Sequence, residues 1–196
     1  AITLAEVDFA GVSGMESLVF ADTAAGAQTF TLGTNVNAGF VTGMNLKATS
    51  TGGGTTLTMS DTTIAETVTI NSTTGINTVT TGSGLTTLNV TSAGVNSGAI
   101  TITSGATSTA ANTITTNSTN GVQAITTSNG NQTINATATI GGVTVTTATG
   151  TDSITVNGGA GAVTATTGAG NDSITVTAAT GAIVVTAGAG ADAITL

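Results

Sequence analysis

Three aspartates recur at intervals of twenty residues near the end of the chain, at Asp152, Asp172 and Asp192. If each interval forms one coil of a repeating structure, parallel strands of adjacent coils lie about 4.8 Å apart and the three carboxylates form one column. Two unit charges at that separation repel by about 3 kcal/mol at an effective dielectric of about 20. A divalent cation bound between the coils would remove this repulsion. The sequence therefore predicts a calcium site, because Ca²⁺ prefers carboxylate and carbonyl oxygens and the chain has no His or Cys.

A second interpretation of the same aspartates needs no metal. Each carboxylate could stabilise its turn by accepting hydrogen bonds from backbone N–H groups. Continuing the twenty-residue steps towards the N-terminus gives Gln132 and Asn112, whose amides carry no charge and are expected to form a neutral hydrogen-bonded ladder. The remaining acids lack this spacing and are expected on the solvated surface, with a further ion near the acidic N-terminal segment as the alternative; they are Glu6, Asp8, Glu16, Asp22, Asp61 and Glu66.

Apolar residues follow the same twenty-residue step and indicate the elements that position the aspartates. One row contains Ile114, Ile134, Ile154, Ile174 and Ile194, and a second row in the other half of each unit contains Val143, Val163 and Ile183. Polar and apolar residues alternate within these segments, as expected for strands with one buried face. The sequence predicts an all-β fold, a parallel β-solenoid (β-helix or β-roll) with coils of about 20 residues and two short strands per coil. Disorder is disfavoured because mean hydropathy is positive, at +0.41, and the rows recur in step.

The regularity divides the chain into three parts, expected to form one continuous domain taken from a longer protein. Residues 112–196 form regular coils, and residues 51–111 form irregular threonine-rich coils. The phase break between Thr91 and Ala111 predicts one longer turn, formed by either SAGVNSGA or SGATSTAAN. Residues 1–50 form wider coils or a cap.

All four phenylalanines lie in residues 1–50, spaced by ten or eleven residues. They are expected to stack inside the wider coils on successive strands, and the alternative is an aromatic binding patch. The segment AEVDFAGVSGMESL could instead form a helical turn or cap.

Composition excludes several classes of function. The chain has a net charge of −8, one Lys and no Arg, His or Cys. Without a histidine base or a cysteine nucleophile we expect no enzyme, and without basic side chains we expect no binding to nucleic acid. No apolar run approaches the length of a transmembrane helix. A structural or adhesive role is left.

The turns that carry the aspartates resemble a known motif. TGAGNDSIT (residues 167–175) and AGAGADAIT (187–195) are similar to the GGxGxDxUx nonapeptide of RTX proteins, calcium-dependent β-rolls secreted by Gram-negative bacteria. Both lack the first glycine, and TATGTDSIT (147–155) keeps only Gly150 and the aspartate. The resemblance implies calcium between adjacent turns, held by Asp carboxylates and turn carbonyls of Asp152, Asp172, Asp192, Gly150, Gly168, Gly170, Gly188 and Gly190. The typical RTX roll has nonapeptides on both sides of an 18-residue coil, whereas the opposite turns here lack acids, so calcium is expected on one edge only.

The overall composition resembles that of surface-layer (S-layer) proteins of proteobacteria. This resemblance implies secretion by a type I system, calcium-dependent folding outside the cell and location on the bacterial cell surface. It also implies self-assembly into a lattice or filament, with lipopolysaccharide or another cell-surface glycan as a further partner.

An alternative function is a calcium-dependent adhesin, or an ice- or surface-binding module, that uses flat rows of threonine. The rows pair Thr144 with Thr164, Thr146 with Thr166 and Thr186, and Thr155 with Thr175 and Thr195. In RTX ice-binding adhesins the recognition residues lie in an xGTGND turn, where this chain has Ala169 and Ala189, so that edge is not reproduced. The ordinary explanation is that β-branched residues suit an exposed sheet face.

Overall fold

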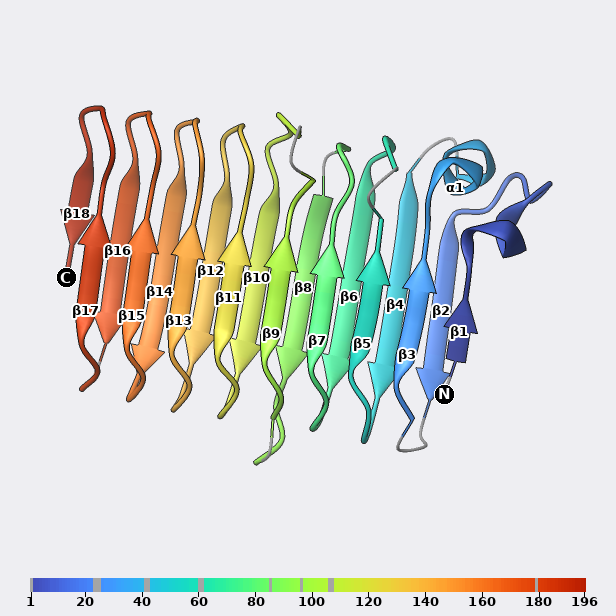
Figure 1. Ribbon diagram of the computed structural model, residues 1–196, viewed down its shortest axis with the longest axis horizontal. Helices are drawn as coiled ribbons and strands as arrows, with labels where there is room; N and C mark the ends of the chain where they lie inside the picture. Colours follow the sequence, from blue (N-terminus) through green and yellow to red (C-terminus); the bar gives the residue numbers. More distant parts are fainter. Residues whose placement is uncertain are drawn as a thin grey trace.

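The protein is a two-sheet parallel β-solenoid, which confirms the predicted fold class. The computed structural model describes residues 2–22, 26–40, 43–59, 62–84, 86–95, 97–105, 108–178 and 180–196. Each coil contributes one strand to each of two nine-stranded sheets, and successive coils stack side by side along the long axis (Figure 1). Sheet A contains β1 (Ile2–Leu4), β3 (Gln28–Thr31), β5 (Thr55–Thr58), β7 (Asn77–Thr80), β9 (Ile100–Thr103), β11 (Gln123–Thr126), β13 (Val143–Thr146), β15 (Val163–Thr166) and β17 (Ile183–Thr186). Sheet B contains β2 (Ser17–Asp22), β4 (Met44–Ser50), β6 (Glu66–Ser72), β8 (Thr86–Ser92), β10 (Thr113–Ser118), β12 (Thr133–Ala138), β14 (Ser153–Gly159), β16 (Ser173–Ala178) and β18 (Ala193–Thr195).

The predicted rows of apolar residues lie inside the solenoid, in register from coil to coil. Ile134 pairs with Ile154, and Ile154 with Ile174, so each step along sheet B is twenty residues. All three side chains are at most 1% exposed. Burying one such side chain contributes about 1.5–3 kcal/mol. Because each of them lies beside its equivalents in the two adjacent coils, each coil is stabilised chiefly by its two neighbours.

The phase break comes from two lengthened turns, so the prediction of a single longer turn was wrong. On sheet A, Val79 pairs with Ile102 and Ile102 with Ile125, so the step on each side of β9 exceeds the regular one by three positions. On sheet B, Leu88 pairs directly with Ile114, and this one step exceeds the regular one by six positions. The insertion is therefore divided equally between the turn before β9 and the turn after it. Both insertions fall between strands, where extra length costs little because the core rows are not disturbed.

The N-terminal coils are wider and include two short helices. Leu18 pairs with Leu46, a longer step than the one between paired residues of the regular coils. The segment η1 (Glu6–Phe9) is a single 3-10 turn, as the alternative interpretation of this segment predicted, and α1 (Thr34–Gly39) is a short α-helix. Figure 1 shows both at the N-terminal end of the sheets.

The prediction that the phenylalanines pack in the interior is correct for most of them, but their expected placement on four strands was wrong. Phe20 on β2 and Phe30 on β3 stack with ring centroids 4.5 Å apart. Phe9 ends η1 and Phe40 follows α1, and both are buried, with at most 5% exposed. The helical segments thus supply part of the core in the wide coils.

Candidate functional site: an aspartate column inside the coils

The structure brings the three aspartates together in a single column. Each lies directly before a sheet B strand, and the first residues of those strands, Ser153, Ser173 and Ala193, pair in register. Within each strand the residues alternate between the interior and solvent. Asp152 and Asp172 therefore face the interior and are only 1% and 2% exposed, while the adjacent Ser153 and Ser173 are exposed.

One oxygen of each carboxylate accepts a hydrogen bond from the backbone of the preceding coil. The backbone N–H of Gln132 donates to Asp152 Oδ1 at 2.8 Å, that of Asp152 to Asp172 Oδ1 at 2.9 Å, and that of Asp172 to Asp192 Oδ1 at 2.9 Å. The aspartates therefore accept backbone hydrogen bonds, as the metal-free interpretation expected. The donors belong to the neighbouring coil, so these bonds join one coil to the next.

The second oxygen of each buried carboxylate has different surroundings in adjacent coils. The Thr147 hydroxyl donates to Asp152 Oδ2 at 2.6 Å. In the next coil the equivalent atoms, Thr167 Oγ1 and Asp172 Oδ2, are both buried and have no hydrogen-bond partner. A buried acceptor without a donor costs about 1–3 kcal/mol. This pair of oxygens is the least satisfied point of the column.

Burial raises the pKa of Asp152 above its ordinary value. The hydrogen bonds from Thr147 and from the Gln132 backbone oppose this shift, and the nearby charge of Asp172 reinforces it. Desolvation and like charge both disfavour the ionised carboxylate. The column can relieve this cost by taking up a proton or a cation.

The column continues towards the N-terminus through uncharged side chains. The Asn112 amide donates to Gln132 Oε1 at 3.0 Å, which confirms the predicted neutral ladder, and Asn112 Oδ1 accepts from the Thr86 backbone at 3.0 Å. The Thr86 hydroxyl donates in turn to Glu66 Oε2 at 3.1 Å. Amides bridge neighbouring coils here because each has both a donor and an acceptor.

Glu66 is an interior residue, so its prediction as solvated surface was wrong. It is 2% exposed, burial raises its pKa, and its Oε1 has no hydrogen-bond partner. The signal that could have found it is spacing, since Glu66 precedes Thr86 by one twenty-residue step and the adjacent Val68–Leu88 row has the same step.

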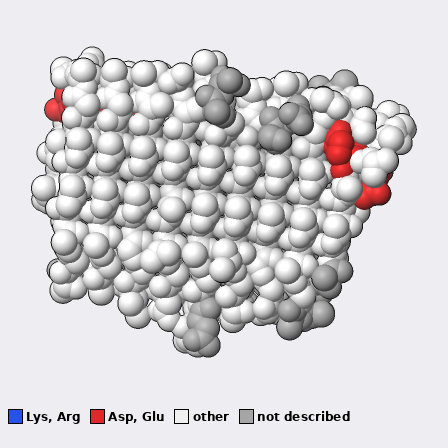
Figure 2. Space-filling model, in the orientation of Figure 1, with Lys and Arg blue, Asp and Glu red and all other residues white. Residues whose placement is uncertain are grey.

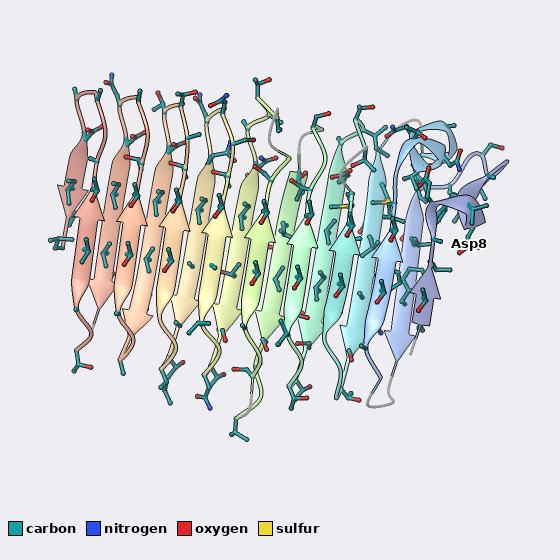
Figure 3. All side chains as sticks on the ribbon, viewed as in Figure 1. Asp8 is labelled. Carbon is teal, nitrogen blue, oxygen red and sulfur yellow. The ribbon has the colours of Figure 1, made fainter. Side chains whose placement is uncertain are left out.

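The other acids do not join the column. Asp8 and Glu16 are exposed, and Figure 3 shows Asp8 at the N-terminal end of the molecule. Glu6 accepts a hydrogen bond from the backbone of Asn35. Asp61 and the side chain of Asp22 lie outside the described residues. Among the residues that the structure describes, no three acidic, His or Cys side chains converge as a metal-binding group.

The glycines of the motif allow the turns to stack closely. A Cβ atom at Gly170 would lie 1.6 Å from the Gly150 carbonyl oxygen, and one at Gly190 would lie 1.7 Å from that of Gly170. A Cβ at Gly188 would similarly meet the Gly168 oxygen at 1.8 Å. Close backbone approach therefore explains why these positions are glycine, whether or not their carbonyls bind a metal ion.

Two of the predicted threonine rows lie on the outward face of sheet A, whereas the row of Thr155, Thr175 and Thr195 lies on the outward face of sheet B. Thr144 pairs with Thr164, and Thr146 pairs with Thr166, which pairs with Thr186. The rows are therefore separated from the aspartate column, which lies inside the solenoid.

Comparisons with known proteins give no relative. No protein-family model matches the chain, and no curated protein or solved structure is significantly similar to it. Across the described part of the chain no helix has the length and hydropathy needed to cross a membrane.

Proposed function

We propose that this chain belongs to a structural protein of a bacterial extracellular surface layer or filament, which assembles with copies of itself and is stabilised by calcium. The observation that supports assembly is an exposed apolar side chain on each of four successive turns from sheet B to sheet A. These turns lie at the edge opposite the aspartate column. We call this set of side chains the apolar edge; it consists of Ile76 (62% exposed), Val95 (79%), Val122 (58%) and Ile140 (57%).

The apolar edge suits contact between copies of a strongly acidic chain. A net charge of −8 opposes the approach of like molecules, so a contact surface must lack charge or be neutralised. The described residues of these four turns contain no Asp, Glu, Lys or Arg. Exposed apolar patches on a soluble protein commonly mark interaction sites.

Substitution of the apolar edge tests assembly. The variant with Val122→Asp and Ile140→Asp should fold normally, because both side chains are exposed, and should lose assembly measured by light scattering and electron microscopy. The matched control carries Val7→Asp and Val19→Asp, which are 72% and 63% exposed at the N-terminal end. If the edge variant assembles like the parent chain and the control, the proposed role of this edge is wrong.

Calcium binding is supported by the unsatisfied oxygens of the column. Asp172 Oδ2 and Thr167 Oγ1 are buried without hydrogen-bond partners. Both are oxygen atoms, the type of ligand that calcium prefers. An ion between adjacent coils would be held by two successive carboxylates, Asp152 with Asp172 or Asp172 with Asp192, and by turn carbonyls, and it would supply the positive charge that the column lacks. Thermal unfolding followed by circular dichroism, with calcium, with magnesium and with chelator, tests this part. Identical melting curves in all three conditions would reject calcium as a stabiliser.

The remaining parts of the proposal rest on the likeness to RTX and S-layer sequences. They are export by a type I system, folding outside the cell, and lipopolysaccharide or another surface glycan as the anchor. Binding of the folded chain to purified lipopolysaccharide, measured in pull-down with and without calcium, tests the anchor.

A further inference from the structure

The outward face of sheet A carries two nearly unbroken ranks of threonine, which we call the threonine face. Parallel pairing in register places each residue beside its equivalent in the next coil. The first rank is Thr3, Thr29, Thr56, Thr78, Thr101, Ala124, Thr144, Thr164 and Val184, and the second is Thr31, Thr58, Thr80, Thr103, Thr126, Thr146, Thr166 and Thr186. From β3 to β15, every strand of sheet A except β11 thus presents a Thr-x-Thr triplet.

Strand propensity alone does not account for this regularity. Sheet B belongs to the same coils and has the same pleat, yet its outward ranks are mixed. One of them reads Val19, Lys47, Thr69, Asn89, Thr115, Asn135, Thr155, Thr175 and Thr195. If threonine served only as a β-branched residue on an exposed sheet, both sheets should show it equally. The difference indicates a role for the face itself.

The threonine face is regular and carries no charge. Figure 2 shows side chains that repeat from coil to coil over the front of the molecule, and the described acidic residues visible there lie at its two ends. Threonines of one rank repeat at about 4.8 Å, the distance between strands, and the two ranks are two residues apart, about 6.6–6.8 Å. None of these threonine hydroxyls bonds to another protein group within the described residues. They are free to bond an external lattice.

We infer that the threonine face binds ice. In a tetrahedral water network with O–H···O distances of about 2.75 Å, second-neighbour oxygens lie about 4.5 Å apart, close to the repeat along each rank. A threonine offers water both a hydroxyl and a methyl group at each lattice point. Strongly hydrated charged side chains, which would impose their own water orientation, are absent from the described part of this face. The inference is independent of assembly through the apolar edge.

Matched substitutions on the two sheets of one coil test this inference. Thr126 on β11 and Thr115 on β10 are both exposed, one on the threonine face and the other on sheet B. The parent chain should shape ice crystals and lower the freezing point below the melting point. Thr126→Tyr should lose this thermal hysteresis because the bulky ring interrupts the regular array of threonines, whereas Thr115→Tyr should keep it. Circular dichroism establishes that both variants are folded.

Three results would overturn the inference. They are a folded parent chain with no thermal hysteresis and no ice shaping, a Thr126→Tyr variant as active as the parent, and an equal loss of thermal hysteresis in both variants. The variant with Val122→Asp and Ile140→Asp should keep the thermal hysteresis of the parent chain. It separates failure of ice binding from failure of assembly, since its substitutions leave the threonine face intact.

Discussion

At the scale of single residues, Asp172 has two opposed roles. Its Oδ1 accepts the backbone N–H of Asp152 and so joins two coils, while its Oδ2 is buried without a partner beside Thr167 Oγ1. The acceptor is needed for the coil contact, but the charge is not. Uncharged residues already occupy the same column at Gln132 and Asn112.

Substitutions at Asp172 separate the hydrogen bond from the charge. Asp172→Ala leaves the Asp152 N–H without its acceptor and should lower the free energy of unfolding by about 1–3 kcal/mol. Asp172→Asn keeps an acceptor and gains a donor for Thr167, so without calcium it should be at least as stable as the parent chain. It should also lose part of any stabilisation by calcium. Urea unfolding with calcium and with chelator measures both effects, and exposed Glu16→Gln is the charge-matched control. Equal calcium responses in Asp172→Asn and the parent would contradict a role of the column in calcium binding.

The buried carboxylates also predict how stability depends on pH. Burial raises the pKa values of Asp152 and Glu66 in the folded chain, so the folded state holds these protons more tightly than the unfolded state does. Their contribution to stability is therefore complete below the ordinary carboxyl pKa and is lost as the pH rises through the raised values. Without calcium, urea unfolding should give a lower free energy of unfolding at about pH 8 than at about pH 5.

Calcium should oppose this loss, because it replaces the proton as the source of positive charge. Its stabilising effect should grow as the pH rises. Stability that increases steadily with pH in chelator would contradict the raised pKa values.

At the scale of the elements, the turns depend on close backbone approach. Gly170 has a φ of 154°, and a Cβ there would lie 1.6 Å from the Gly150 carbonyl oxygen. Gly142, at the opposite edge, would place a Cβ 3.1 Å from its nearest neighbour, and the next coil has Ala162 at the equivalent position. The two edges therefore tolerate a methyl group very differently.

Substitution of these two glycines by alanine should show this difference. Gly170→Ala should destabilise the chain by about 3 kcal/mol or more, because the turn backbone must move apart. Gly142→Ala should change stability by about 0.5 kcal/mol or less. Thermal unfolding in the presence of chelator compares the two without any contribution from a metal. Comparable losses in the two variants would contradict the close stacking of the motif turns.

The sequence predicted the elements well where spacing alone determines them. The rows of Ile and Val at twenty-residue steps indicated the parallel pairing and the interior side of each strand. The alternation also implies that Asp172, two residues before Ile174, faces the interior, but the expectation of a metal site obscured this. The burial of Glu66 was missed because it belongs to no motif, although its position two residues before Val68 places it on the interior side of the strand. The two lengthened turns were missed because the step from Leu88 to Ile114 is the same whether all the extra residues enter one turn or are divided between two.

At the scale of the whole molecule, stability comes from contacts between neighbouring coils. Such a structure behaves approximately as a one-dimensional array, in which each unit is stabilised by its nearest neighbours. A core defect should therefore act locally before it acts globally.

Two isoleucines of one coil region test this behaviour. Ile134→Ala removes a fully buried side chain and should cost about 2–5 kcal/mol, while Ile140→Ala removes an exposed one and should cost about 0.5 kcal/mol or less. Hydrogen exchange in Ile134→Ala should rise first in β12 and in its partners β10 and β14. A uniform rise across all coils would indicate that the solenoid unfolds as a single cooperative unit.

The constant twenty-residue step of the regular coils has a consequence for how such a gene can change. Because β12, β14 and β16 pair at equal offsets, duplication or loss of one whole unit, such as residues 153–172, leaves every remaining partner equivalent. Each duplication would lengthen the solenoid by about 4.8 Å, one strand spacing, and would add one aspartate to the column. Unequal recombination in steps of sixty nucleotides could thus produce natural length variants that remain foldable, whereas a gain or loss of a single codon inside a strand would reverse which of its side chains face the core.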